Sequence, residues 1–265
     1  MTSSSADLFS LDGRRALVTG ATGPLGSVLA DTLASLGARV IVSDLDADRC
    51  HAVAAELTDR HGVEAEAAPV NLLGADGPAT LADAVGDQLD VLVNNAAFTG
   101  TSGVPGYAVP FPEQTDEAFD LATRLNLQVP FSLSRRLAPR LAASGHGAIV
   151  NVSSIYGIVG PNMGLYESTT MGNPAAYGAS KGGIVQLTRY LATVLAPDVR
   201  ANAFAPGGIA RGQDDAFTER YTKLTPLARM ATEDDFRGVV AWLASDASRY
   251  VTGQTIPVDG GWSAW

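Results

Sequence analysis

Two kinds of segment alternate along the chain. Short runs of Val, Ile, Leu and Ala, apolar on both faces, are typical of buried parallel strands. Longer stretches of helical character separate them, and this alternation predicts βαβ units around a parallel sheet. We expect strands at Arg15–Thr19, Arg39–Ser43, Glu64–Val70, Leu89–Val93, Ala148–Val152, Val199–Phe204 and Thr255–Val258. We expect helices between them, notably at Pro24–Leu36, Glu117–Ala142, Ala175–Leu195 and Glu233–Leu243.

The pattern predicts a three-layer, doubly wound α/β fold with a parallel seven-stranded sheet. A chain of 265 residues suits one such domain, placed at residues 11–265 after a flexible tail at residues 1–10. Two long irregular stretches, Phe98–Thr115 and Gly160–Pro174, follow strand ends. Because the carboxyl ends of parallel strands form the ligand crevice, we expect both loops to be functional.

The composition excludes several classes of partner. The chain has 18 basic and 28 acidic residues, a net charge of −10, which disfavours binding to nucleic acid or anionic membranes. Its one cysteine, Cys50, has no partner for an internal disulfide, and its three histidines lack metal-ligand spacing. Because the start lacks a signal-peptide pattern and no apolar run has membrane-spanning length, we expect a cytoplasmic protein.

A glycine-rich turn follows the first strand and opens the first helix, with the sequence Thr19-Gly20-Ala21-Thr22-Gly23-Pro24-Leu25-Gly26. Glycines let the backbone turn sharply and let a pyrophosphate approach the N–H groups at the helix start. Pro24 suits the first helical turn, where its missing N–H costs nothing. The motif alone equally fits an ordinary βα turn.

Asp44 favours the dinucleotide interpretation. It ends the second strand, 18 residues beyond Gly26, where a carboxylate can accept both ribose hydroxyls and repel a 2′-phosphate. No lysine or arginine follows until Arg49, so the sequence favours NAD over NADP. A solvated acid at a strand end is the alternative.

Tyr177 and Lys181 lie four residues apart, on one face of a predicted helix. A nearby ammonium favours the phenolate, so we expect Lys181 to lower the pKa of Tyr177 and make it a usable acid and base. The pair alone arises on many exposed helices. Here it is preceded, in order, by the glycine-rich turn, Asn94-Asn95-Ala96-Ala97 and Ser153-Ser154.

This ordered set resembles the single-domain type of the short-chain dehydrogenase/reductase superfamily, over essentially residues 10–265. The resemblance implies a Rossmann fold and a nicotinamide-dependent interconversion of an alcohol and a ketone. It implies that Asn126 supports a proton-relay water and that Ser154 hydrogen-bonds the substrate oxygen. Tyr177 would then be the acid and base, while Lys181 would hold the ribose and tune the tyrosine.

The resemblance also implies the binding residues. Asn94 would stabilise the sheet, and the backbone of Ile209 would touch the nicotinamide carboxamide. The expected cofactor residues are Gly20, Thr22, Gly23, Pro24, Leu25, Gly26, Asp44, Leu45, Asn71, Leu72, Asn95, Ala96, Ala97, Tyr177, Lys181, Pro206, Gly207 and Ile209. The expected substrate residues are Ser154, Tyr156, Tyr166, Tyr177, Gly208 and Arg211.

Several positions depart from the family pattern. The glycine spacing resembles that of sugar-nucleotide epimerases and dehydratases, although the chain lacks their extra carboxyl-terminal domain. Asn71 replaces an aspartate that usually holds the adenine amine, and Ala97 replaces a glycine. Ser154 and Tyr177 are 23 residues apart, longer than is usual, and the extra residues are Pro161–Met171.

We therefore expect an NAD-dependent oxidoreductase acting on a secondary alcohol. A sugar epimerase or dehydratase with transient oxidation, and a non-catalytic NAD-binding regulator, are the alternatives. The insertion, taken as the whole stretch Gly160–Pro174, carries hydroxyl, amide and carboxylate groups. These are at Asn162, Tyr166, Glu167, Ser168, Thr169, Thr170 and Asn173. They favour a sugar, cyclitol or polyol over a steroid, which would leave them unpaired, although an exposed polar loop is equally compatible. The insertion also resembles those of family members that act in sugar and polysaccharide pathways. Arg211 would suit a phosphate or carboxylate.

Family resemblance also implies a homotetramer or homodimer, assembled through Glu117–Ala142 and Ala175–Leu195. The chain ends in Gly261-Trp262-Ser263-Ala264-Trp265. Two large apolar rings in a terminal segment favour burial against a partner subunit, so we expect Trp262 and Trp265 at that interface.

Overall fold

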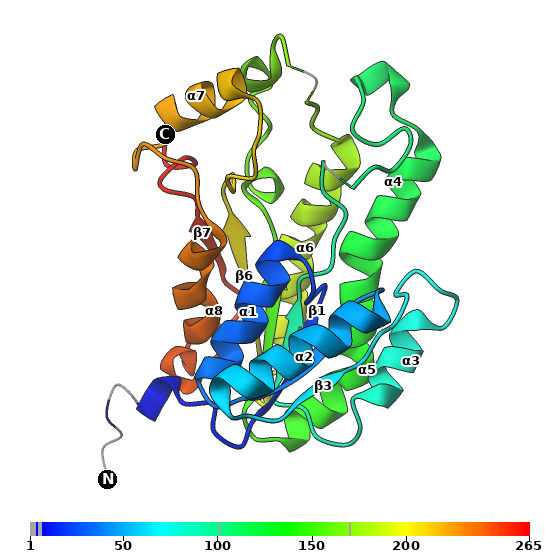
Figure 1. Cartoon of the computed structure of the whole chain (residues 1–265), viewed down its shortest axis with the longest axis vertical. Helices are drawn as coiled ribbons and strands as arrows, with labels where there is room; N and C mark the ends of the chain where they lie inside the picture. The colour runs from blue at the N-terminus through cyan, green and yellow to red at the C-terminus, as the bar shows by residue number, and fades with distance from the viewer. Residues whose placement is uncertain (1–3, 5–6, 101, 170) are drawn as a thin grey trace.

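All seven strands form one parallel sheet in the order β3-β2-β1-β4-β5-β6-β7. Figure 1 shows the whole chain, with helices packed around this sheet. The computed structural model describes residues 4, 7–100, 102–169 and 171–265; Thr101, Thr170 and most of the predicted tail, residues 1–3 and 5–6, lie outside them. The strands are β1 Arg15–Thr19, β2 Arg39–Ser43, β3 Ala65–Ala67, β4 Val91–Asn94, β5 Gly147–Val152, β6 Val199–Pro206 and β7 Thr255–Val258. The predicted Rossmann fold is confirmed.

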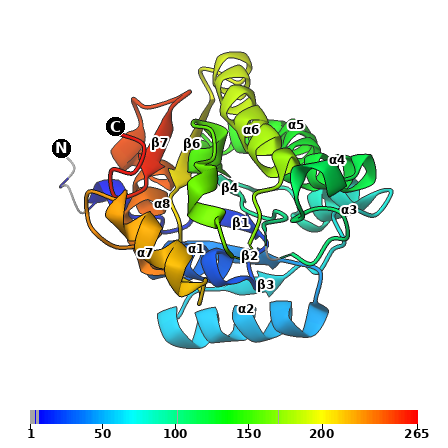
Figure 2. The same ribbon diagram turned by 90° about the horizontal axis from the view of Figure 1, so that it is seen from above.

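Helices cover both faces of the sheet, and Figure 2 shows the three layers from above. The helices are α1 Pro24–Ser35, α2 Ala47–His61, α3 Gly77–Ala84, α4 Asp116–Thr123, α5 Val129–Ala143, α6 Ala175–Val194, α7 Asp215–Lys223 and α8 Arg237–Ala244. Alternate strand residues face opposite layers: Ala16 and Val18 pack towards α1, α2 and α8, while Leu17 packs towards α3, α5 and α6. Both faces are apolar because both are buried. Within the described ranges, none of the helices combines the length and apolar character needed to cross a bilayer.

Several boundaries differ from the predicted ones, among them those of the third strand and of the long helix over Glu117–Ala142. Only Ala65–Ala67 of the predicted third strand is strand, yet the N–H groups of Ala68 and Val70 still donate to Val42 and Asp44. The predicted helix over Glu117–Ala142 is α4 and α5 joined by a π-helical turn, Arg124–Gln128. Such turns interrupt helices frequently at functional sites, and this one contains Asn126.

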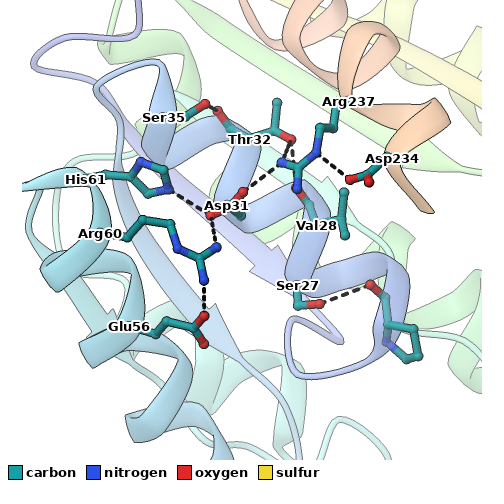
Figure 3. A network of polar contacts seen from close by, with 11 residues as sticks. Ser27, Val28, Asp31, Thr32, Ser35, Glu56, Arg60, His61, Asp234 and Arg237 are labelled. Carbon is teal, nitrogen blue, oxygen red and sulfur yellow. Dashed lines mark hydrogen bonds and ion pairs between the residues drawn. The ribbon is translucent and has the colours of Figure 1, made fainter. Parts of the chain in front are cut away.

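Asp31 ties α1 to two other helices (Figure 3). Its carboxylate accepts hydrogen bonds from Arg60 at 2.9 Å, His61 at 2.7 Å and Arg237 at 2.7 Å. Burial acts to raise the pKa of Asp31, but these hydrogen bonds outweigh burial and hold the pKa below its usual value. The helix that follows the glycine-rich turn is therefore braced between α2 and the start of α8.

Candidate active site

The glycine-rich turn leaves no room for side chains at two of its glycines. A Cβ on Gly26 would lie 2.0 Å from the carbonyl oxygen of Gly20, and one on Gly20 would lie 2.9 Å from the Cα of Ala96. Gly20 also has a φ of +66°, in the left-handed region. Gly23, the residue before α1, has no side chain that could cap the helix, and Pro24 lies in the first turn. This cradle fits a pyrophosphate at a helix start.

Asp44 faces the turn from the end of β2. Its carboxylate accepts from the N–H of Thr22 at 3.1 Å, the hydroxyl of Thr22 at 2.7 Å and the N–H of Leu45 at 2.7 Å. Arg49 reaches back from α2 and donates to the carbonyl of Thr22. Arg49 lies five residues after Asp44 along the chain, but the first turn of α2 brings Arg49 back to Thr22. A positive and a negative side chain therefore both flank Thr22.

The asparagines expected around the cofactor have different partners. Asn94 donates to the side chain of Asn151 at 2.9 Å and so links β4 to β5. Asn95 donates to the carbonyls of Thr19 and Gly20, so its side chain holds the glycine-rich turn in place. Asn71, expected to hold the adenine, accepts the N–H of Leu73 at 3.0 Å with its amide oxygen. That oxygen thus caps its own turn.

The other expected cofactor residues surround this end of the sheet. Leu45 is exposed, Leu72 is buried, and Ala96 and Ala97 are half-buried. The N–H of Ala96 donates to the hydroxyl of Thr19 at 3.1 Å, which places the end of β4 against the turn.

Three predicted catalytic residues meet at the carboxyl end of β5. Ser154 lies beside Tyr177, and its side chain acts to lower the pKa of the phenol. The Lys181 ammonium, 3% exposed, donates to the carbonyl of Val152 at 2.7 Å and lies 5.9 Å from the centre of the Tyr177 ring. The neighbouring Ser153 has a structural contact instead. Its hydroxyl donates to the carbonyl of Lys181 at 2.9 Å and fixes the start of α6 on β5.

Asn126, the fourth predicted catalytic residue, is 1% exposed in the π-helical turn. Its amide oxygen accepts from the N–H of Phe98 at 2.8 Å, and its amide nitrogen donates to the hydroxyl of Ser180 at 3.1 Å. It therefore joins the loop after β4 to α6 beside Tyr177. The buried Tyr107, which the sequence did not single out, donates to the carbonyl of Phe98 at 3.4 Å, a carbonyl that Asn126 also binds, and burial raises the pKa of its phenol.

The turn after β6 lies against the carboxyl-terminal segment. Gly207 donates to the carbonyl of Val258 at 3.0 Å, and Gly208 donates to the hydroxyl of Tyr221 at 2.5 Å. Ile209 pairs with Ala231 in a short parallel bridge. Two residues beyond, the Arg211 guanidinium binds Glu233 at 2.8 Å.

The insertion packs on α7, beside it at the top of Figure 1. Arg220 of α7 donates to the carbonyls of Leu165 and Glu167 at 3.3 and 2.6 Å. The Tyr166 hydroxyl lies 2.9 Å from that of Tyr156 and accepts from Asn173 at 3.0 Å. Of the polar insertion residues that the structure describes, Asn162, Glu167 and Ser168 are exposed. Tyr166 instead bonds Tyr156, in the segment after Ser154, and Asn173 bonds Tyr166.

Comparison with known proteins identifies the family. A family model described as enoyl-(acyl carrier protein) reductase matches residues 20–263. Nodulation protein G of Rhizobium meliloti (strain 1021) is 34% identical over 264 residues, which span 96% of this chain and 98% of that protein. The chain belongs to the short-chain dehydrogenase/reductase superfamily. The resemblance inferred from its motifs is thereby confirmed.

Solved members of the superfamily have closely similar structures. A gluconate 5-dehydrogenase from Burkholderia cenocepacia J2315, in complex with NADP and tartrate, has a TM-score of 0.87 at 29% identity, covering 99% of this chain and 100% of that one. A protein described as a putative NAD(P)-dependent gluconate 5-dehydrogenase from Beutenbergia cavernae, with bound NADP, has a TM-score of 0.86 at 36% identity, covering 97% and 100%. Superfamily members bind nicotinamide cofactors, and the cradle around Gly20 and Gly26 fits one.

Two expectations for this dehydrogenase/reductase are wrong. Burial raises the pKa of Tyr177, and it outweighs the opposing hydrogen bond from Ser154 and charge of Arg211, so the pKa is not lowered. Trp262 is 8% exposed because it packs within its own chain, with its ring stacked on Tyr221 at 5.9 Å. Trp265, at 80% exposed, is the terminal ring that remains available to a partner.

Replacing Tyr177 by Phe should lower turnover at least about 100-fold, because it removes the titrating oxygen and keeps the ring. Circular dichroism and cofactor titrations should match those of the wild type. Tyr190→Phe, on the exposed side of the same helix, is the control and should retain full activity. Turnover by Tyr177→Phe near the wild-type rate would contradict the catalytic assignment.

Lys181 should reduce stability at neutral pH. Burial lowers its pKa from 10.5 to about 8, so below pH 8 the folded chain must bury an ammonium. Between pH 8 and 10.5 the folded state has lost a proton that the unfolded state keeps, and the cost fades. Lys181→Met should therefore unfold with about 1–3 kcal/mol more free energy at pH 7, after allowing for the lost hydrogen bond to Val152.

Urea unfolding between pH 6 and 10.5 measures this difference. The advantage of Lys181→Met should shrink as the pH rises above 8, while its activity is lost. Lys223→Met, at an exposed ion pair, should change stability by less than about 1 kcal/mol. A Lys181→Met protein less stable than the wild type at pH 7 would contradict the burial argument.

Proposed function

We propose that the protein interconverts a secondary alcohol and a ketone in a polyhydroxy compound, a sugar, cyclitol or related polyol, with NAD as cofactor. The observation that carries the proposal is the placement of Ser154 beside Tyr177 at the carboxyl end of β5, with the Lys181 ammonium 5.9 Å from the centre of the tyrosine ring. A bound nicotinamide would accept or supply the hydride. Tyr177 transfers the hydroxyl proton, and Ser154 polarises the same oxygen.

The polar groups beside this pair support a polyhydroxy substrate. Tyr156, Tyr166 and Asn173 form one hydrogen-bonded cluster, and the charge on Tyr166 also bears on the pKa of Tyr177. Because Tyr156 lies two residues after Ser154, its hydrogen bond joins Tyr166 to the segment that carries the proposed catalytic serine. A steroid or fatty ketone would leave such groups without partners, which is unfavourable.

Arg211 supports a substrate that carries an acidic group. Its Nε is held by Glu233, and its charge lowers the pKa of Tyr177, so the guanidinium lies within electrostatic range of the reacting oxygen. The similar structures described as gluconate 5-dehydrogenases, one of them with tartrate, bind or act on polyhydroxy acids. A sugar acid is thus the first anionic substrate to test.

Asp44 supports NAD, and Arg49 provides the opposing argument. A carboxylate at the end of β2 repels a 2′-phosphate, whereas a guanidinium beside Thr22 would attract it. The carboxylate accepts directly from the turn, and Arg49 donates to a carbonyl. We therefore assign the preference to Asp44.

A substrate panel tests the function. Sugars, polyols, cyclitols, sugar acids such as gluconate, and steroids are incubated with excess NAD, and NADH absorbance is followed. A polyhydroxy compound should give sustained NADH formation, whereas an epimerase would recycle the cofactor and a regulator would produce none. Oxidation of the steroids alone would contradict the proposed substrate.

Asp44→Ala should narrow the difference between NAD and NADP, because it removes the charge that repels a 2′-phosphate. Fluorescence titration of both cofactors measures the change. Arg49→Gln is the matched variant and should weaken NADP while leaving NAD nearly unaffected. A wild-type preference for NADP would contradict the NAD proposal.

Replacing residues 160–170 by a short turn should abolish activity on the polyhydroxy substrate, because it removes Tyr166. Affinity for NAD should persist, since the glycine-rich turn and Asp44 are untouched. Tyr166→Phe isolates the hydroxyl and should raise the substrate KM about 5–10-fold, as expected for one lost hydrogen bond. Full activity in the shortened protein would show that the insertion is not a substrate wall.

We also infer a homotetramer or homodimer in the cytoplasm. Exposed apolar side chains support assembly: Phe119 and Phe131 on α4 and α5, Tyr190 and Val194 on α6, and Trp265 at the carboxyl end. The single buried cysteine, Cys50, suits a reducing compartment. Light scattering at micromolar concentration should give a mass of two or four chains, and a monomer mass would contradict the inference.

A further inference from the structure

Tyr221 of α7 is a buried phenol whose oxygen contacts the turn after β6. Its side chain is 2% exposed, and its hydroxyl oxygen accepts the N–H of Gly208 at 2.5 Å. Burial raises the pKa of the phenol to about 12, so it stays neutral near pH 7. Tyr221 therefore acts here as a fixed hydrogen-bond acceptor.

The turn is enclosed on two sides. A Cβ on Gly208 would lie 2.8 Å from the ring of Tyr221, and one on Gly207 would lie 2.8 Å from the Cα of Asp259. The two glycines therefore allow α7 and the carboxyl-terminal segment to close on the turn. The carbonyl of Gly208 accepts the N–H of Ala231 at 2.9 Å, so Gly208 is held through both its N–H and its carbonyl.

The same phenol belongs to a closed ring of aromatic side chains. Successive ring centres are 5.3 Å apart for Tyr166 and Phe217, 5.9 Å for Phe217 and Tyr221, 5.9 Å for Tyr221 and Trp262, and 6.3 Å for Trp262 and Tyr156. The hydrogen bond between Tyr156 and Tyr166 closes the ring. The ring joins the insertion, α7, the carboxyl end and the segment after Ser154.

We propose that Tyr221 is a positioning residue, which through the N–H of Gly208 sets the turn Pro206–Ile209 against the nicotinamide end of the cofactor. The proposal rests on the proposed function only in requiring that a nicotinamide cofactor binds. It gives α7, on which the insertion packs, a role in cofactor binding. The closed ring of aromatic side chains then joins the insertion and the turn Pro206–Ile209 into one unit.

The hydroxyl matters because the N–H that it accepts is enclosed. Without the oxygen, Gly208 would lose its partner, and an unpaired enclosed donor is costly. The turn would have space to shift, because Gly207 and Gly208 also border a cavity with Arg229, Val258 and Gly260. The adenosine end would be unaffected, because Asp44 and the glycine-rich turn lie on other elements.

Two ligands that differ only in the nicotinamide test the proposal. NADH and ADP-ribose are titrated by calorimetry into the wild type, Tyr221→Phe, and the control Tyr250→Phe, whose side chain is fully exposed. Tyr221→Phe should weaken NADH about 5–10-fold, the effect of one net hydrogen bond, and change ADP-ribose less than about twofold. If the wild type prefers 2′-phosphorylated ligands, NADPH and 2′-phospho-ADP-ribose replace the pair.

Thermal unfolding verifies that each variant is folded. Trp262→Phe provides a second variant, which keeps the hydroxyl and loosens the ring behind it, and it should weaken NADH selectively by about two- to threefold. Unchanged NADH affinity in both variants would overturn the proposal, as would an equal loss for NADH and ADP-ribose. These titrations need no substrate, so an unsuccessful substrate panel leaves their result intact. A wild type that binds neither ligand would overturn the proposed function and this proposal together.

Discussion

A buried ammonium is the constraint on which the site depends. Lys181 has lost nearly all contact with water, and its ammonium donates to the carbonyl of Val152 at 2.7 Å. Placing a charge in such surroundings is unfavourable unless its partners are held in place. Ser153 meets that need by bonding the Lys181 carbonyl, and Gly157 by allowing close approach. The start of α6 is thereby seated on the end of β5.

That seating determines where the phenol lies. Tyr177 is one turn before Lys181 on α6, so a helix fixed at the lysine presents the tyrosine to Ser154. The same burial that allows this arrangement raises the pKa of the phenol. Spacing along a helix can reveal that two groups are neighbours. It cannot reveal how much water surrounds them, and here desolvation exceeds the effect of charge.

Much of the fold followed from local pattern. Strands such as Arg15–Thr19 and Arg39–Ser43 were predicted with their observed bounds, because strands buried on both faces are apolar runs. The limits of the third strand were not, since Glu64 and Val70 lie where the ladder ends and continue it only by single hydrogen bonds. The break between α4 and α5 has no sequence pattern, because it is set by contacts of Asn126 with other elements.

Residues of the candidate site were predictable where they lie together in one continuous segment of the chain. The glycine-rich turn and the tyrosine–lysine pair are contiguous motifs, and both lie where expected. Arg49 was discounted for its distance along the chain and Tyr221 was not singled out, because each makes its contact across the fold, with Thr22 and Gly208 respectively. Trp262 was misplaced for a similar reason: apolarity predicts burial, but only packing decides whether the neighbour is another subunit or the same chain.

The π-helical turn at Arg124–Gln128 sets the phase between two lengths of helix. Ala118 and Ala122 before it face Tyr107 and the start of α6, whereas Leu133 and Leu137 after it face the sheet. One residue of an α-helix subtends about 100°, so deleting one residue within the turn would rotate one length against the other by that angle. Either the alanines or the leucines would then leave their partners. This helix should consequently accept many substitutions but no change in length. The number of residues in the turn matters to the candidate site as much as Asn126 does.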